Sequence, residues 1–343
     1  MKTFCYCTHG GVQNILFPEN PSVFNNHHYK NHFMQSKLVY RLASALLLAG
    51  ALFVASCSKK DSTPTPGGGD TTRPGGVEMG APEKYTKKAI VEEFTGTWCG
   101  WCPRMPILLD KLHAKYPNLV ISAFHASDTF DIGKDIRKVI EEKMGVQGYP
   151  TSILERTESI DWFDTDDKIN YQQAEAIVGK AFSKPAVLGL ALNTTVSGSN
   201  LNITVKVGMG QALTVAKAKV LIYVVEDGLV ATQTNYYADD RVKGAYEKDP
   251  DLGPLTKLPA KIAGYEYHHV VRKVLTDAKG DEIPAAYKIK GAIYSKDYTV
   301  DISKYKAAKT QVIAVVYGQD DEGKLADTYN AQVVVAGQSQ KFD

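Results

Sequence analysis

The stretch that decides the fold reads Phe94-Thr95-Gly96-Thr97-Trp98-Cys99-Gly100-Trp101-Cys102-Pro103. Two cysteines at this spacing either close a small disulfide ring or open into a dithiol. The mostly apolar run of residues 87–94 before them indicates a buried strand. After them, apolar residues at helical spacing over 105–116 predict a helix that ends before Pro117. The cysteine pair is therefore expected where a strand leads into a helix.

That position favours thiol chemistry. Cys99 stands before the first helical turn, where unpaired backbone N–H groups and the helix dipole stabilise a thiolate. Cys102, one turn later, is placed to attack a mixed disulfide formed at Cys99. A purely structural disulfide and half of a zinc site remain alternatives. Zinc needs two further ligands, and the mature chain offers no second C-x-x-C and no H-x-x-x-H. We predict no metal and no cofactor besides a redox-active Cys99–Cys102 disulfide.

Strand, WCxxC and helix together resemble the thioredoxin superfamily over roughly residues 86–183. Gly148-Tyr149-Pro150-Thr151 is similar to the loop in which that fold carries a cis-proline before a core strand. Glu93 stands six residues before Cys99, where the superfamily has a buried carboxylate beneath its disulfide. If the strand register differs by one residue, Glu92 takes that place instead.

The resemblance implies a role for each of these residues. Cys99 is expected as the nucleophile, Cys102 as the resolving thiol and Glu93 as the acceptor of the Cys102 proton. Tyr149 and Pro150 are expected to contact an extended substrate. We expect Trp98 to pack beside the disulfide and Trp101 to be exposed and to contact a partner. Disulfide isomerases carry a histidine where Trp101 stands, so its uncharged indole favours a reductase-like or intermediate potential.

A narrower resemblance rests on the stretch 92–104, the leader and the long C-terminal half. Together they are similar to the lipoproteins related to the twenty-eight-kilodalton outer-membrane protein of Gram-negative Bacteroidetes. This resemblance implies an outer-membrane, cell-envelope location more clearly than it implies a biochemical role.

The N-terminal segment indicates export and lipid anchoring. Residues 1–33 lack periodicity and are interpreted as a start codon placed too early or as a disordered segment. Residues 34–56 have a basic start and an apolar core too short to span a bilayer, which is typical of a signal peptide. They lead into Cys57 through Val54-Ala55-Ser56, which resembles the lipobox whose cysteine is acylated. Residues 57–85, rich in Pro and Gly, are predicted to be a flexible tether.

Within residues 86–183 the periodicity predicts the order β-α-β-α-β-β-α. A second buried strand is expected over 119–125, a helix from about residue 132 to 143, a strand after Pro150, a short partner strand near 159–162 and a last helix capped by Asp164-Thr165. His125 closes the second strand at the end of the sheet where ligands bind. It is either a neighbour of the site or a loop histidine.

Beyond Ser183-Lys184-Pro185 the pattern changes to alternating strands separated by turn residues. Residues 184–343 are predicted to form an all-β immunoglobulin-like sandwich, with strands that include 187–196, 219–226 and 287–294. Asp239–Gly264 is too long for a hairpin and is interpreted as a functional loop. His268 and His269, on one expected strand, would point to opposite faces. They are read as a solvated strand or a partner or interdomain contact rather than a metal site.

Composition restricts the possible partners. The chain has 343 residues, a formal net charge of +2 and 23% charged residues, which offers no electrostatic argument for nucleic acid. The expected partners are an envelope protein, as substrate or redox partner, and the membrane through the N-terminal lipid. The favoured function is a thiol–disulfide oxidoreductase acting on protein disulfides. The alternative is a binding or adhesion lipoprotein that uses the fold as a scaffold with a static disulfide.

Overall fold

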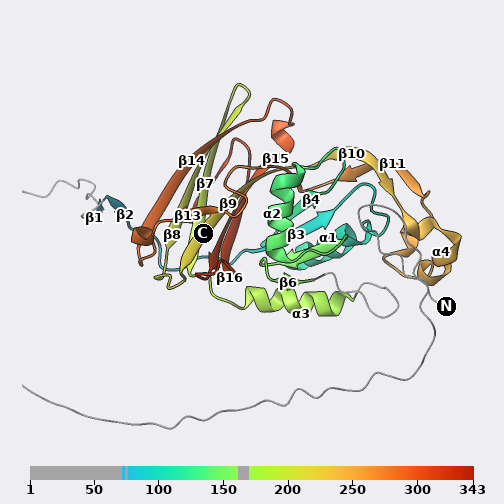
Figure 1. The fold of residues 1–343 in the computed structure, drawn as a ribbon, viewed down its shortest axis with the longest axis horizontal. Helices are drawn as coiled ribbons and strands as arrows, with labels where there is room; N and C mark the ends of the chain where they lie inside the picture. Colours follow the sequence, from blue (N-terminus) through green and yellow to red (C-terminus); the bar gives the residue numbers. More distant parts are fainter. Residues whose placement is uncertain (1–71, 74–75, 161–169) are drawn as a thin grey trace, which may run out of the picture. The chain divides into compact units, whose positions relative to one another are not determined.

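The computed structural model describes residues 72–73, 76–160 and 170–343 (Figure 1). The predicted signal peptide, the lipidated Cys57 and the Asp164-Thr165 cap lie outside these residues. The described residues belong to one compact unit. Among the described helices, none combines the length and the apolar character needed to cross a bilayer.

The first half of the unit has the predicted element order. Its elements are β3 (Ala89–Thr95), α1 (Arg104–Lys115), β4 (Leu119–His125), α2 (Lys134–Met144), β5 (Thr151–Leu154), β6 (Glu158–Ser159) and α3 (Tyr171–Phe182). Strand β3 pairs in parallel with β4 and antiparallel with β5, and β6 continues the sheet beyond β5. The predicted strands and the first two helices are found within a few residues of their expected places. The last helix begins later than expected, at Tyr171, because the Asn170 side chain caps it by accepting a hydrogen bond from Gln173 N.

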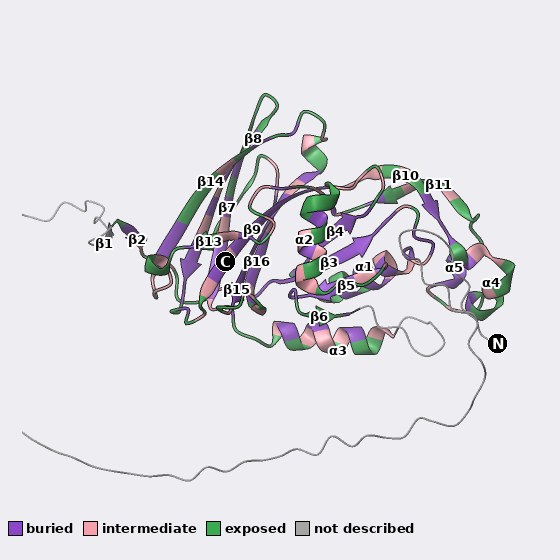
Figure 2. Cartoon of the chain, in the orientation of Figure 1, coloured by how far each residue is buried: buried purple, intermediate pink, exposed green. Residues whose placement is uncertain are grey.

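Every residue of β3 and β4 is buried, because both faces of the sheet are covered (Figure 2). Side chains alternate along a strand. The odd-numbered Ala89 and Val91 pack with α1 and α3, and the even-numbered Ile90 and Phe94 pack with Ile140 of α2. Helices α2 and α3 accordingly lie on opposite sides of these strands (Figure 1).

The second half is rich in strands. They are β7 (Leu188–Ser197), β8 (Asn200–Met209), β9 (Lys217–Glu226), β10 (Leu229–Thr234), β11 (Lys261–Tyr267), β12 (Val270–Val274), β13 (Asp281–Ile283), β14 (Ala292–Asp301), β15 (Thr310–Gln319), β16 (Leu325–Val335) and β17 (Ser339–Gln340). Short helices intervene at α4 (Asp240–Tyr246), α5 (Gly253–Thr256), η1 (Tyr236–Ala238), η2 (Ala285–Tyr287) and η3 (Ala307–Lys309). The strand expected over 287–294 begins only at Ala292, because Tyr287 ends a helical turn and Gly291 has a φ of +85°.

Two sheets pack face to face in this half. One is six-stranded in the order β1-β2-β14-β8-β7-β17, where β1 is Thr72–Arg73 and β2 is Val77–Met79. Its apolar face shares a core with β9, β15 and β16 of the other sheet. The predicted tether therefore ends earlier than residue 85. Strand β2 pairs with β14, and Val77 is buried in that core.

The second sheet runs through both halves. Its order is β16-β15-β9-β12-β4-β3-β5-β6, and Val270 of β12 pairs in parallel with Ala123 of β4. Residues 183–185 thus separate two sequence patterns within one continuous sheet. Strand β9 shows the consequence: Val220, Ile222 and Val224 face the sandwich core, while Tyr223 packs against Phe124 on the other face.

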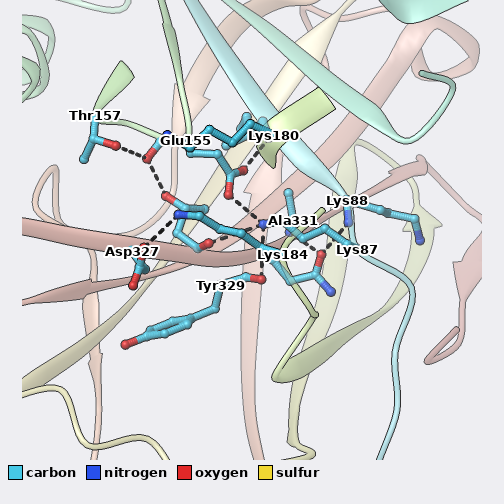
Figure 3. Close-up of polar contacts among 12 residues, drawn as sticks. Lys87, Lys88, Glu155, Thr157, Lys180, Lys184, Asp327, Tyr329 and Ala331 are labelled. Carbon is cyan, nitrogen blue, oxygen red and sulfur yellow. Dashed lines mark hydrogen bonds and ion pairs between the residues drawn. The ribbon is translucent and has the colours of Figure 1, made fainter. Parts of the chain in front are cut away.

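Buried charges join the two halves. In the β5–β6 turn, Glu155 accepts a hydrogen bond from Lys87 at 2.6 Å, and Lys87 also donates to the carbonyl of Tyr329 in β16 (Figure 3). The next residue, Arg156, donates at 2.7 Å to Glu92 of β3 and at 2.9 Å to Tyr223 of β9. Turn residues from the first half therefore fix the position of the sheet that the second half supplies.

Candidate functional site

Cys99 and Cys102 form a disulfide in the turn between β3 and α1. Backbone hydrogen bonds from Cys99 N to Gly96 O and from Cys102 N to Cys99 O shape this turn, at 3.0 and 3.2 Å. The helix proper begins at Arg104. Cys99 is 4% exposed and Cys102 is 2% exposed. The disulfide thus stands at the predicted place in the chain, but it is closed off from solvent.

Glu93 and Cys102 line one cavity of about 70 Å³ beneath the disulfide. Since a water molecule needs about 10–15 Å³ of such space, the cavity suits water rather than a peptide. The pKa of Glu93 is raised to about 8: burial raises it most, a hydrogen bond from Thr95 opposes the rise, and the nearby charge of Asp110 adds to it. The structure therefore brings together the two residues that sequence reasoning paired. The cavity is lined by Glu93, Thr95, Cys102, Pro103, Pro106, Leu109, Asp110, Ile121, Ala123, His125, Gln233, Tyr265, Glu266, Tyr267, His268 and His269.

Glu92, the alternative to Glu93, lies on the opposite face of β3. It is fully buried and accepts hydrogen bonds from Arg156 Nη1 and Tyr223 Oη, both at 2.7 Å. It does not line the cavity beneath the disulfide. The strand register thus favours Glu93 as the carboxylate beside Cys102.

Residues Gln233–Tyr236, which we name the cover segment, lie along the cysteine loop. The backbone N–H of Thr234 donates to Thr97 O at 2.8 Å, and that of Tyr236 donates to Gly100 O at 3.0 Å. The side-chain amide of Gln233 donates at 2.8 Å to Cys99 O, which lies between those two acceptors in the sequence. The approach is so close that a Cβ at Gly100 would stand 2.3 Å from the Tyr236 ring. The second half of the chain therefore buries Cys99.

The two tryptophans have environments opposite to those predicted. Trp98 is 42% exposed, although its Nε1 donates to Ala126 O at 2.6 Å. Trp101 is partly buried and packs edge-on against Tyr236, Tyr237 and Tyr246, with ring centroids 5.6, 5.2 and 6.3 Å away. The reason is the long segment after β10, which folds over Trp101 and leaves Trp98 outside.

Tyr149 and Pro150 form the predicted loop, and the peptide bond between them is cis. Pro150 is buried. The Tyr149 hydroxyl donates to Glu141 and accepts a hydrogen bond from Arg137 Nη1 at 3.1 Å. Its ring packs edge-on against Trp98, with centroids 5.5 Å apart. Tyr149 is thus held beside the exposed tryptophan.

Histidines gather at the same cavity. His125, at the end of β4, is a site neighbour rather than a loop residue; its Nδ1 lies 2.7 Å from Asp128 Oδ2, and its buried Nε2 has no partner among the described residues. His268 and His269 both line the cavity, so the expectation that they face opposite ways is wrong. They occupy the turn between β11 and β12, where His269 has a φ of +56°. Within the described ranges, no group of acidic, histidine and cysteine side chains could hold a metal ion.

Sequence reasoning missed the contribution of β10 and β11. Gln233 is 2% exposed, and its Oε1 accepts a hydrogen bond from Tyr267 Oη at 2.7 Å. Tyr265 also lines the cavity, and burial raises its pKa to about 12, helped by the charges of Glu93 and Asp110. A signal did exist in the stretch 265–269, read as a possible interdomain contact. His269 O accepts from Ala123 N at 2.8 Å, which is such a contact.

Comparisons with known proteins agree on family and fold. The sequence model of the family described as "Outer membrane protein Omp28" matches residues 137–340. No curated protein matches the chain. The solved structure of HBP35 of Porphyromonas gingivalis is similar at a TM-score of 0.53 and 19% identity, over 74% of this chain and 76% of that one. This likeness is one of fold.

Two further structures are more distant. A protein of Agrobacterium tumefaciens has a TM-score of 0.42 and 15% identity, over 77% of this chain and 98% of that one. A domain of the outer membrane lipoprotein Omp28 from Porphyromonas gingivalis has a TM-score of 0.25 and 17% identity, over 44% of this chain and 89% of that one.

Proposed function

This chain belongs to the family of the outer membrane protein Omp28, and we propose that it is an envelope thiol–disulfide oxidoreductase acting through Cys99 and Cys102. Family membership confirms the predicted location in the outer membrane of the cell envelope. Lipidation of Cys57 stays a prediction, since that residue lies outside the described ones.

The observation that carries the proposal is the cavity shared by Glu93 and Cys102. A pKa of about 8 for Glu93 is close to the ordinary thiol pKa of about 8.5, and matched pKa values favour proton transfer between two groups. Burying a carboxyl group without a counter-charge is costly. A disulfide with a purely structural role has no need of such a neighbour.

The proposed reaction consumes one substrate disulfide and the two thiols of Cys99 and Cys102. In the reduced protein the Cys99 thiolate attacks a sulfur of a protein disulfide, forms a mixed disulfide and displaces the other sulfur as a thiolate. Cys102 then gives its proton to ionised Glu93, attacks Cys99 Sγ and displaces the second substrate thiolate. The substrate disulfide is reduced and the Cys99–Cys102 dithiol is oxidised. A dithiol protein of the envelope restores the starting form, and the reverse sequence oxidises a substrate dithiol.

A thioredoxin-like assignment of residues 86–183 is part of the proposal. It is supported by the order β3-α1-β4-α2-β5-β6-α3 and by the cis peptide before Pro150. An immunoglobulin-like sandwich remains our proposal for residues 184–343, supported by the core between the two packed sheets.

The second candidate is a surface or outer-membrane binding protein with a static disulfide. One observation favours it: Cys99, the expected nucleophile, is 4% exposed beneath the cover segment. A nucleophile that never meets solvent performs no exchange.

The reduction potential separates the two candidates. A form beginning after Cys57 holds only Cys99 and Cys102, so alkylation followed by mass spectrometry reports their state without interference. After equilibration in glutathione buffers, an exchange centre is expected between about −120 and −270 mV. A disulfide still closed below about −300 mV would leave the binding protein as the function. Cys99→Ser is the control for exchange.

A further inference from the structure

The cover segment meets the cysteine loop as one extended chain meets another. Its donors follow one another along the chain, and the acceptors are the carbonyls of Thr97, Cys99 and Gly100. Thr234, the donor to Thr97, ends strand β10 and is therefore extended. The contact leaves Cys99 4% exposed.

Aromatic packing accompanies these hydrogen bonds. The Tyr236 ring lies over Gly100, which has no side chain to obstruct it, and packs edge-on against Trp101. Tyr236 nevertheless remains 45% exposed, whereas the next residue, Tyr237, is fully buried. Within the cover segment only Tyr236 borders solvent, whereas Gln233, Thr234 and Asn235 are buried.

We propose that the carbonyls of Thr97, Cys99 and Gly100 are the docking surface for an extended segment of a cysteine-containing protein, and that the cover segment occupies this surface as an internal stand-in. An extended substrate offers backbone N–H groups to the carbonyls of Thr97 and Gly100 in place of those of Thr234 and Tyr236, and a side-chain donor to Cys99 O in place of the Gln233 amide. Its departure from the loop uncovers Cys99 for attack. Because Tyr236 fills the space between Gly100 and Trp101, the preferred substrate carries an aromatic residue near its cysteine. The inference rests on the proposed oxidoreductase function.

Two substitutions loosen the cover segment without changing the cysteine loop. Gln233→Ala removes the hydrogen bond to Cys99 O. Tyr267→Phe removes only the hydroxyl that orients the Gln233 side chain, and so keeps the aromatic packing. Val230→Ala is the matched control, because Val230 lies on the same strand and is 62% exposed.

The experiment follows reduction of the Cys99–Cys102 disulfide in the mature full chain, held in detergent, by three thiols. These are glutathione and two extended peptides that each carry one cysteine and differ only in a Tyr or an Ala beside it. In each case a probe thiolate attacks Cys99 Sγ and displaces Cys102 as a thiolate, which takes up a proton. A second probe thiolate then attacks the probe sulfur of the mixed disulfide, which displaces Cys99 as a thiolate and releases the oxidised probe. Gln233→Ala removes the hydrogen bonds that this side chain makes with Cys99 O, Thr234 O and Tyr267 Oη, and is expected to speed reduction by about tenfold. The effect is expected to be smaller in Tyr267→Phe and absent in Val230→Ala. In Gln233→Ala the Tyr peptide is expected to react faster than the Ala peptide.

The outcomes separate the inference from the function beneath it. If the disulfide is reduced at equal rates in wild type and both loosened variants, while glutathione still reduces it, the cover segment is not an internal stand-in. The proposed oxidoreductase function would be unaffected by that result. The same holds if the two peptides react equally in Gln233→Ala. A disulfide that no thiol opens in any variant would overturn the proposed function itself.

Discussion

Two neighbouring carboxyl groups on β3 have opposite surroundings. Glu92 points into the junction of the two halves, where Arg156 and Tyr223 each donate to it at 2.7 Å. Glu93 points under the disulfide, into a cavity that it shares with Cys102, where the charge of Asp110 adds to the rise of its pKa. Strand alternation alone puts two identical side chains into these two places.

This difference shows that the surroundings of a buried carboxyl group determine its role. Burial raises the pKa of Glu92 as well, but the charge of Arg156 and the hydrogen bonds from Tyr223 and Arg156 oppose that rise, and the paired groups fix one another's arrangement. An unpaired buried carboxyl group has a pKa raised toward neutrality and can exchange a proton at physiological pH. We therefore assign a stabilising role to the Glu92 side of β3 and a role in proton transfer to the Glu93 side.

The largest expected effect comes from breaking the Glu92 side. Arg156→Met leaves Glu92 buried without its counter-charge and is expected to lower the free energy of unfolding by about 3–5 kcal/mol. Urea denaturation measures this. The double variant Glu92→Leu/Arg156→Met removes both charges and is expected to recover much of the loss; additive losses would contradict the pairing.

The Glu93 side predicts a dependence of stability on pH. Between the ordinary carboxyl pKa of 4.5 and the raised value of about 8, the folded protein binds the proton that the unfolded chain has lost. Stability therefore falls as pH rises through this window, by on the order of 5 kcal/mol, and levels off above it. Glu93→Gln is expected to flatten this part of the curve. An equal slope in that variant would show that Glu93 does not carry the effect.

Near pH 8, where Glu93 is partly ionised and can accept the Cys102 proton, Glu93→Gln is expected to slow ring closure by about a hundredfold, within the range typical of a lost proton acceptor. Stopped reactions of the reduced protein with a small disulfide, quenched by acid, give this rate. Asp110→Asn, which changes another carboxyl of the same cavity, serves as the comparison. A much smaller loss is expected there.

The smallest expected effect comes from removing one hydrogen bond on the Glu92 side of β3. Tyr223→Phe removes one of the two hydrogen bonds to Glu92 and is expected to cost about 1–2 kcal/mol of stability. Because Tyr223 lies on the Glu92 side of β3, the exchange rate should not change. A changed rate would mean that the two sides of the strand are coupled.

Much of the first half follows from local patterns. Apolar runs and helical spacing place β3, α1, β4, α2 and β5 because those elements bury their own faces against one another. Because side chains alternate along β3 and β4, Glu93 and His125 lie on the same face of the sheet once the pairing register of these two strands is known. The choice between Glu92 and Glu93 required the structure, since Arg156 lies in a turn whose inward direction no pattern reveals.

What escaped prediction depends on contacts distant in sequence. Trp101 is covered by tyrosines of the segment after β10, and the sequence around Trp101 does not predict that contact. His268 and His269 were expected on a strand because their neighbours alternate, but the chain turns there to bring β12 beside β4. The uninterrupted apolar run of β9 was a usable sign, since a strand buried on both faces needs a neighbour beyond its own sandwich.

The most direct test of the division is a carboxyl titration of Glu93 by ¹³C NMR in the oxidised and reduced protein, assigned with Glu93→Gln. Our account predicts an inflection near pH 8 in the oxidised form and a displaced one after reduction, because the new Cys102 thiol then shares the cavity. An inflection near the ordinary value of 4.5, or one that reduction leaves unmoved, would contradict it.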